Sequence, residues 1–182
     1  PDLVNSSDLG VNFKTKTPYF TSELGIFNGE GYHSDKTENN QKNSNEGQLS
    51  GEWRLTGHIL GDGNKVGKYD RTKDMYANIS FAGLHSTNHK DNAAAVGDAA
   101  EYDRDMYIFH GVFNHPMFLV GAQYVTATDK GHNDAAKAAV ASYDKEYNIW
   151  SINSEVRPAK DWTILARYDD LKVKYPDQTA SA

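Results

Sequence analysis

The chain of 182 residues is long enough for one domain of ordinary size. It holds no run of about 18 apolar residues, which excludes a bundle of transmembrane helices, and its formal net charge of -6 argues against a general nucleic-acid binder. Cysteine is absent, so disulfide frameworks and thiolate metal sites are excluded. A transmembrane barrel stays open, because barrel strands need only every second residue to be apolar.

Alternation of polar and apolar side chains predicts about eight β-strands along the chain. The clearest alternation, EGQLSGEWRLTGHILGDG from position 46, puts Trp53 on an apolar face and Arg54 on a polar face. The stretch RDMYIFHGVFN is apolar on both faces, and either an inward-folded loop or a subunit contact could cover its second face. The predicted strands cover residues 8–14, 19–27, 48–60, 75–84, 104–114, 117–128, 145–157 and 162–173.

The connections alternate between short turns and long polar loops. KTKTP, NHPM and RPAKD read as short turns, and GDGNKVGKYDRTKD is an over-long member of the same side. The long loops are residues 28–47, 85–103 and 129–144, and alanine in the last one makes a short helix at 134–142 as plausible as an irregular loop. Short turns on one side and long loops on the other are typical of a transmembrane barrel.

Aromatic side chains fall mostly on the face that we expect to turn toward lipid, since aromatic rings are favoured at the two membrane interfaces. The alternative is that aromatic residues are simply common in strands. The expected lipid-facing aromatics are Trp53, Phe81, Tyr107, Phe113, Phe118, Tyr124, Trp150, Trp162 and Tyr168.

Charged side chains on the opposite face are candidates for the lining of a water-filled pore. Arg54, Arg157 and Arg167 are expected to form its basic side, and opposite charges across the lumen would orient polar solutes. The plainer alternative is that these charges only solvate the face or pair with one another. The candidate pore-lining residues are Lys14, Glu23, Glu52, Arg54, His58, Arg104, Glu155, Arg157, Arg167 and Asp169.

Catalytic and metal-binding patterns are weak. His85 and His89 beside Asp91 lie at a predicted strand end and loop, not on a helix that would align them for zinc. Asp62, Asn64 and Asp70 offer oxygen ligands but lack the spacing of a calcium-binding EF-hand loop, so a polar turn is the better interpretation than a weak calcium site. No nucleophile-elbow, phosphate-loop or dinucleotide signature occurs. We therefore expect no enzyme activity, no metal site and no cofactor.

Two segments resemble a known family. SSDLGVNFKTKTPYFTSELGIFNGEGY near the start and RPAKDWTILARYDDLKV near the end are similar to hairpins of Gram-negative outer-membrane porins, most nearly the phosphate-selective porin O and P family. The resemblance implies a large antiparallel barrel, commonly trimeric, that passes small solutes passively. No motif matches the family's anion-binding arginines and lysines, so phosphate selectivity is not implied. Porins of this kind have about twice as many strands and end on an aromatic residue.

The sequence thus predicts an all-β fold, an antiparallel transmembrane β-barrel with about eight strands present, as part of a barrel of about 16 strands. We expect residues 1–182 to be a single β-barrel domain, incomplete at both ends. The expected function is a porin in the bacterial outer membrane, a homotrimer whose partners are the lipid bilayer and small polar or ionic solutes, with no nucleic acid. The alternatives are a narrow closed eight-stranded barrel serving as anchor or adhesin, and a soluble glycan-binding β-sandwich.

Overall fold

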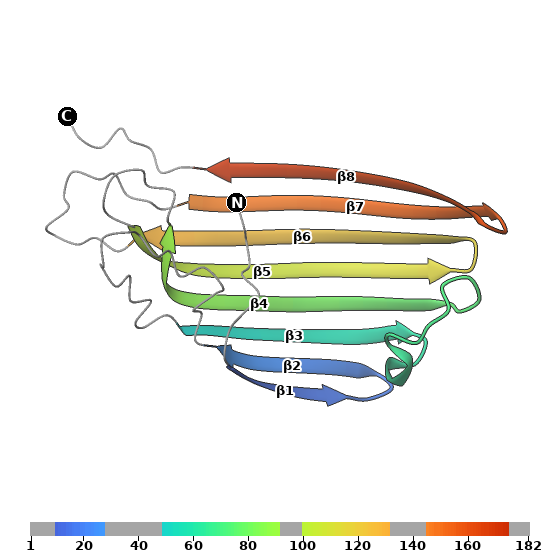
Figure 1. Cartoon of the computed structure of the whole chain (residues 1–182), viewed down its shortest axis with the longest axis horizontal. Coiled ribbons are helices and arrows are strands. Elements are labelled where there is room, and N and C mark those ends of the chain that lie inside the picture. The colour runs from blue at the N-terminus through green and yellow to red at the C-terminus, as the bar shows by residue number, and fades with distance from the viewer. Residues whose placement is uncertain (1–9, 28–48, 92–99, 132–144, 175–182) are drawn as a thin grey trace, which may run out of the picture.

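The described part of the chain forms one antiparallel sheet of eight strands in chain order, with β1 and β8 at its two edges (Figure 1). This computed structural model describes residues 10–27, 49–91, 100–131 and 145–174, without the side chains of 88–91, 100–102 and 131. No helix in these ranges is long and apolar enough to cross a membrane. The elements are β1 (Gly10–Lys16), β2 (Phe20–Phe27), β3 (Leu49–Leu60), the 3-10 helix η1 (Gly63–Lys65), β4 (Tyr76–Asp91), β5 (Ala100–His115), β6 (Phe118–Gly131), β7 (Lys145–Ala159) and β8 (Trp162–Lys174).

All eight predicted strands are confirmed, and the main difference lies between β4 and β5. Most of the predicted loop at residues 85–103 belongs to strands, since β4 continues to Asp91 and β5 begins at Ala100. Residues 85–91 are all polar, so the alternation that marks a strand in sequence is lost although the backbone ladder continues. The helix considered at 134–142 lies outside the described residues.

The chain reverses direction at every connection, so alternate connections lie at the same end of the sheet. We call the two ends the turn end and the loop end. The connections at the turn end are residues 17–19, 61–75, 116–117 and 160–161 (Figure 1). Those at the loop end are residues 28–48, 92–99 and 132–144. The predicted alternation of the two sets of connections is confirmed. Their lengths follow the prediction only in part, because residues 61–75 at the turn end form a longer connection than residues 92–99 or 132–144 at the loop end.

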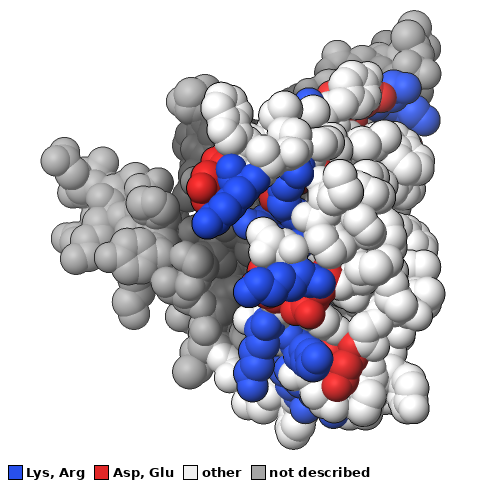
Figure 2. Space-filling model, turned by 90° about the vertical axis from the view of Figure 1, so that its right-hand side faces the viewer, with Lys and Arg blue, Asp and Glu red and all other residues white. Residues whose placement is uncertain are grey.

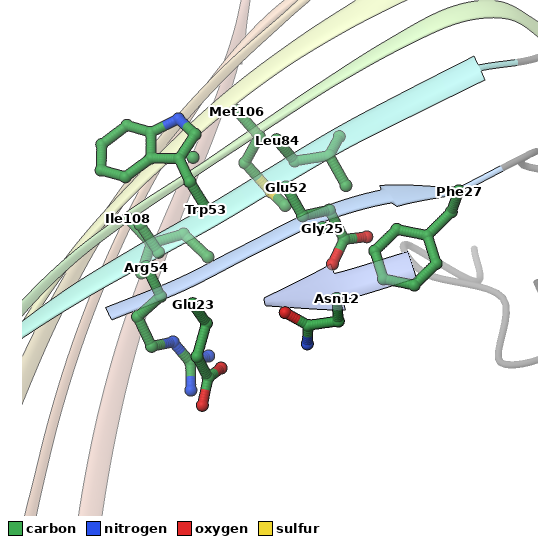
Figure 3. Close-up of a pocket in the computed structure, with 12 residues that line it drawn as sticks. Asn12, Glu23, Gly25, Phe27, Glu52, Trp53, Arg54, Leu84, Met106 and Ile108 are labelled. Atoms are coloured by element: carbon green, nitrogen blue, oxygen red, sulfur yellow. The ribbon is translucent and has the colours of Figure 1, made fainter. Parts of the chain in front are cut away.

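The two sides of the sheet carry different side chains. Residues opposite each other on paired strands share a side, so Trp53 shares one with Gly83 and Tyr107, whereas Arg54 shares the other with Ala82. The sheet is curved, and Figure 3 shows Trp53 and Arg54 on opposite sides of it. We call the Arg54 side the concave face and the Trp53 side the convex face. All the buried polar residues of the described chain belong to the concave face: Ser50, His58, Ser86, Arg104, Asn114, Asp129 and Glu155.

Aromatic rings pack against one another on the convex face. Trp53 meets Phe81 edge-on with ring centroids 4.6 Å apart, and Phe81 stacks on Phe109 at 4.3 Å. Gly83 leaves room for the indole, because a β-carbon at this position would lie 2.5 Å from Trp53 Nε1. The Trp53 ring thus covers the glycine in the neighbouring strand, which by itself offers no side chain to pack.

We expect Gly83→Ala to lower the free energy of unfolding by about 1–3 kcal/mol, because its methyl group overlaps the Trp53 indole. Gly111→Ala is the matched control: Gly111 lies on the same face in β5, and a β-carbon there meets nothing within 4 Å. Urea unfolding in detergent, followed by tryptophan fluorescence, compares the two variants. Equal stability of both would contradict the packing described.

Candidate functional site: the two faces of the sheet

The ten residues predicted to line a pore all lie on the concave face. Lys14 lies opposite Glu23, Glu23 lies opposite Arg54, and each later strand continues this face in register. Figure 2, which views the molecule from the turn end, shows Lys, Arg, Asp and Glu side chains gathered toward one side, while the right-hand margin is largely uncharged. The ten residues are Lys14, Glu23, Glu52, Arg54, His58, Arg104, Glu155, Arg157, Arg167 and Asp169.

The nine aromatic residues predicted to face lipid all lie on the convex face. Many large apolar side chains of this face are half or more exposed, among them Phe13 at 71% and Trp162 at 69%. No second sheet packs on them within the described ranges, where all eight strands belong to one sheet. The nine residues are Trp53, Phe81, Tyr107, Phe113, Phe118, Tyr124, Trp150, Trp162 and Tyr168.

The convex face changes character partway along β5 to β8. From the turn end, β6 and β8 first present apolar residues and then switch to polar ones toward the loop end, and β5 and β7 do the same apart from His115 and Ser154. The last apolar residue before the switch is aromatic in every case: Tyr107, Tyr124, Trp150 and Tyr168. The outward residues that follow them toward the loop end are Asp105, Thr126, Asn148 and Asp170. An apolar band with an aromatic border therefore occupies the turn-side part of these strands.

Several of the concave-face residues are fixed against the sheet and do not extend into free space. Arg104 binds Asp129 through two contacts, Nε to Oδ1 at 2.7 Å and Nη2 to Oδ2 at 2.9 Å, and both side chains are buried. Both ring nitrogens of His58 lie within hydrogen-bond distance of a partner, Thr21 Oγ1 at 3.0 Å and Asn78 Oδ1 at 2.8 Å. Arg104 thus joins β5 to β6, and His58 joins β3 to β2 and to β4.

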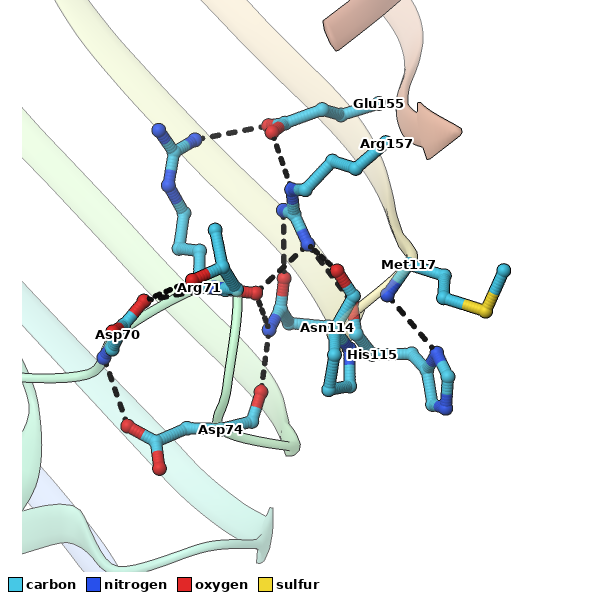
Figure 4. A network of polar contacts seen from close by, with 10 residues as sticks. Asp70, Arg71, Asp74, Asn114, His115, Met117, Glu155 and Arg157 are labelled. Atoms are coloured by element: carbon cyan, nitrogen blue, oxygen red, sulfur yellow. Dashed lines mark hydrogen bonds and ion pairs between the residues drawn. The ribbon is translucent and has the colours of Figure 1, made fainter. Parts of the chain in front are cut away.

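A second group of polar residues closes the turn end (Figure 4). Arg157 Nε donates to Glu155 Oε1 at 2.7 Å, and its Nη2 donates to Asn114 Oδ1 at 3.0 Å. Arg157 Nη1 donates to the backbone oxygens of Arg71 and His115, at 2.8 and 2.9 Å. The Arg157 side chain is only 8% exposed. It therefore holds the connections at this end together and is not a solvent-exposed charge.

Two hollows lie on the concave face beside charged side chains of the first strands. One, of about 210 Å³, is bordered by Glu52, Arg54 and Leu84 among others (Figure 3). The other, of about 270 Å³, lies nearer the turn end and is bordered by Lys14, Lys16 and Arg54. Arg54 borders both and is itself exposed, so it is the predicted residue best placed to meet a solute.

Apolar side chains cross the concave face between the polar rows. The sequence predicted this only for β5, but the register continues it from β4 to β8. Nothing in the described ranges covers the rows with a second layer, so the inward-folded loop and the subunit contact stay open as covers. One row is Ala82, Ile108, Val125, Ile149 and Leu171, and the next is Leu84, Met106, Ala127, Tyr147 and Val173.

The residues considered for calcium serve as turn-forming groups. Asp62 Oδ1 accepts from the backbone N of Asn64 at 2.9 Å and caps η1. Asp70 Oδ1 accepts from the backbone N and the hydroxyl of Thr72, at 3.0 and 2.7 Å. Thr72 and Lys73 lower the pKa of Asp70 to about 2, with the Thr72 hydroxyl as the largest cause. Both carboxylates thus accept hydrogen bonds from donors within the chain itself.

The zinc candidate is tested only in part. His85 Nδ1 lies 2.6 Å from Asp105 Oδ1 on the convex face, while the side chains of His89 and Asp91 lie outside the described part of the structure. Among the described residues, no group of three or more His, Asp or Glu side chains could hold a metal ion.

The sequence missed residues whose role depends on distant partners. Asn114 is fully buried and donates through Nδ2 to the backbone oxygens of Arg71 and Asp74, at 3.1 and 2.7 Å. Nothing in its local pattern distinguishes it from any turn asparagine. Lys16 follows Lys14 at the strand spacing of two, so continuing the alternation would have placed it on the concave face.

Comparison with protein-family models, curated proteins and solved structures gives no match for this chain. The resemblance to porins therefore rests on the two quoted segments alone.

We expect Arg104→Met to lower the free energy of unfolding by about 3 kcal/mol or more, because it leaves the Asp129 carboxylate buried without its guanidinium partner. The double variant Arg104→Met with Asp129→Leu should recover most of this loss, since neither charge then remains buried. Urea unfolding of the two single variants and the double variant measures the coupling. Additive losses would show that the two side chains do not depend on each other.

The Asp70 carboxyl should titrate near pH 2, below the usual 3.8, in an NMR titration of the protein in detergent. Because the pKa is lowered in the folded state, the stability gained from Asp70 is present above about pH 4 and is lost as the pH falls through about 2. Thr72→Val removes the hydroxyl donor and should raise the midpoint toward 3.8. An unchanged midpoint in this variant would exclude the hydroxyl as the main cause.

Proposed function

We propose that this chain forms part of an outer-membrane porin, a water-filled β-barrel through which small polar solutes and ions diffuse. The observation that carries the proposal is the sorting of side chains on a single-layer sheet. Its convex face exposes a band of apolar and aromatic residues, while the charges at the level of this band lie on the concave face. Lipid outside and water inside would satisfy both faces at once.

The length of the strands supports a membrane-spanning role. β4 to β8 have between 13 and 16 residues, more than the roughly 9–11 that a tilted strand needs to cross a bilayer. The aromatic border at Tyr107, Tyr124, Trp150 and Tyr168 would lie at the interface on the loop side. Phe118 and Trp162, at the starts of β6 and β8, would lie at the interface on the turn side. The polar remainder of each strand would then project beyond the membrane.

The outer edges of β1 and β8 indicate how many strands the complete barrel contains. In lipid every backbone donor and acceptor needs a partner, so an inserted sheet has to close. The eight strands form an open sheet in which β1 does not pair with β8. Further strands that complete a barrel of about 16 would satisfy both edges and leave an aqueous channel, whereas closure by eight strands would leave an interior filled by side chains.

The two alternative functions differ in what they require. A glycan-binding β-sandwich needs a second sheet on the apolar face, and the described strands all belong to one sheet. A closed eight-stranded anchor needs β1 paired with β8 and predicts no conductance. Homotrimer formation and location in the bacterial outer membrane belong to the proposal as implied by the porin resemblance, and the lack of a cofactor or enzymatic activity belongs to it because the sequence carries no catalytic signature.

Planar-bilayer recording of the detergent-purified natural full-length protein tests the proposed function. We expect stable open steps of the size of a water-filled pore. Insertion without conductance would instead favour the narrow anchor barrel, and a protein that stays soluble without detergent would favour the sandwich.

Charge reversal on the concave face should change ion preference. Arg54 and Arg167 are exposed there, so replacing both by Glu should shift the reversal potential in a salt gradient toward cation preference. Arg157 is unsuited to this test because it holds the turn end together. Lys172→Glu is the matched control, since Lys172 is equally exposed but lies on the convex face. A shift of equal size in the control would contradict the interpretation that only the concave face lines the pore.

A further inference from the structure

Residues 61–75, which join β3 to β4, extend across the concave face at the turn end. Near one end of this link, the backbone N of Gly63 donates to the oxygen of Pro18 at 2.8 Å. Near the other end, Arg71 Nη1 donates to Glu155 Oε2 at 2.9 Å. Because Pro18 belongs to the first hairpin and Glu155 to β7, the link reaches across most of the width of the sheet.

The link lies against the concave face and does not extend away from the sheet. A β-carbon on Gly63 would collide with the backbone oxygen of Thr17 and with the His58 ring, so only glycine allows this approach. Val66 borders the hollow of about 270 Å³ together with the concave-face residues Arg54 and His110. The link therefore narrows the space in front of the concave face at the turn end.

Contacts at both ends hold the link in one position. Asn114 Nδ2 and Arg157 Nη1 both donate to the backbone oxygen of Arg71, and Figure 4 shows them meeting around it. Inside the link, the Tyr69 hydroxyl bridges the backbone N and O of Asp62, at 2.5 and 2.7 Å, and the Tyr69 ring stacks on Tyr76. Because the link makes this many contacts with the backbone, we expect it to stay rigidly attached to the sheet.

We propose that residues 61–75 form a fixed constriction at the turn-side mouth of the pore, with Val66 and Arg71 at its rim. This inference rests on the proposed function. Val66 is 43% exposed and the Arg71 side chain 60% exposed, so both remain accessible to a passing solute. The constriction limits solute size, and the Arg71 guanidinium stands beside the solute path.

A single introduced cysteine tests the constriction, because residues 1–182 contain none of their own. Val66→Cys in the full-length protein is recorded in planar bilayers before and after addition of a charged methanethiosulfonate reagent. We expect a stepwise loss of current on modification, since the added group occupies the narrow mouth. Ile79→Cys is the control: Ile79 is 59% exposed but lies on the convex face, where lipid would keep the charged reagent away, so the same treatment should leave the current unchanged.

The outcomes separate this inference from the proposed function. Open steps that persist unchanged after modification of Val66→Cys, confirmed by mass spectrometry, would overturn the constriction and leave the pore in place. No open steps from the unmodified natural protein would overturn the pore itself. If Val66→Cys does not insert, Lys68→Cys on the same exposed link takes its place, with the same expected loss of current.

Discussion

The structure depends on the register of the antiparallel strands. Side chains alternate with a period of two, so a slip by one residue would move every residue of a strand to the opposite face. The register places Trp53 against Gly83 and Arg54 against Ala82, and the same separation continues to β8. One apolar face and one charged face therefore follow from pairing alone, and the described strands bury hardly any hydrophobic side chain between them.

The described strands bury little apolar surface against one another. Among the described hydrophobic residues, only Val125 and Ala127 are buried, so burial within the sheet contributes little. Backbone pairing and cross-strand contacts supply local order, as in the Trp53, Phe81 and Phe109 ring contacts and in the Arg104–Asp129 pair. A bilayer against the convex face would supply the missing apolar contacts, and the connections at the turn end would hold the strands in position.

The sequence predicted the strands and their faces well because both depend on local alternation. Trp53 and Arg54 are neighbours with opposite character, and this contrast decides their faces without knowledge of the rest of the chain. The prediction was wrong at residues 85–91 and 100–103, which belong to β4 and β5. Residues 85–91 are polar on both sides, so the pattern gives no period although the ladder continues. Whether β1 and β8 pair with each other depends on the two outer edges of the sheet together, and the pattern of a single strand does not contain that information.

The roles of single charged residues were less accessible from sequence. Arg157 and Arg167 look alike as charges on one face, but Arg157 is only 8% exposed and binds the connections at the turn end, whereas Arg167 is 70% exposed. The difference comes from Asn114 and Arg71, which are far from Arg157 in sequence and near it in space. Sequence alternation gives the direction of a side chain, and only the fold gives its partners.

Spin-label accessibility along β4 tests the two faces most directly. Single labels at successive positions from Ala77 to Ala82 in the full-length protein, reconstituted in lipid vesicles, would be probed with oxygen and with a water-soluble nickel complex. We expect alternation, with oxygen contact at Ala77, Ile79 and Phe81 and nickel contact at Asn78, Ser80 and Ala82. Nickel contact at all of these positions would contradict lipid on the convex face.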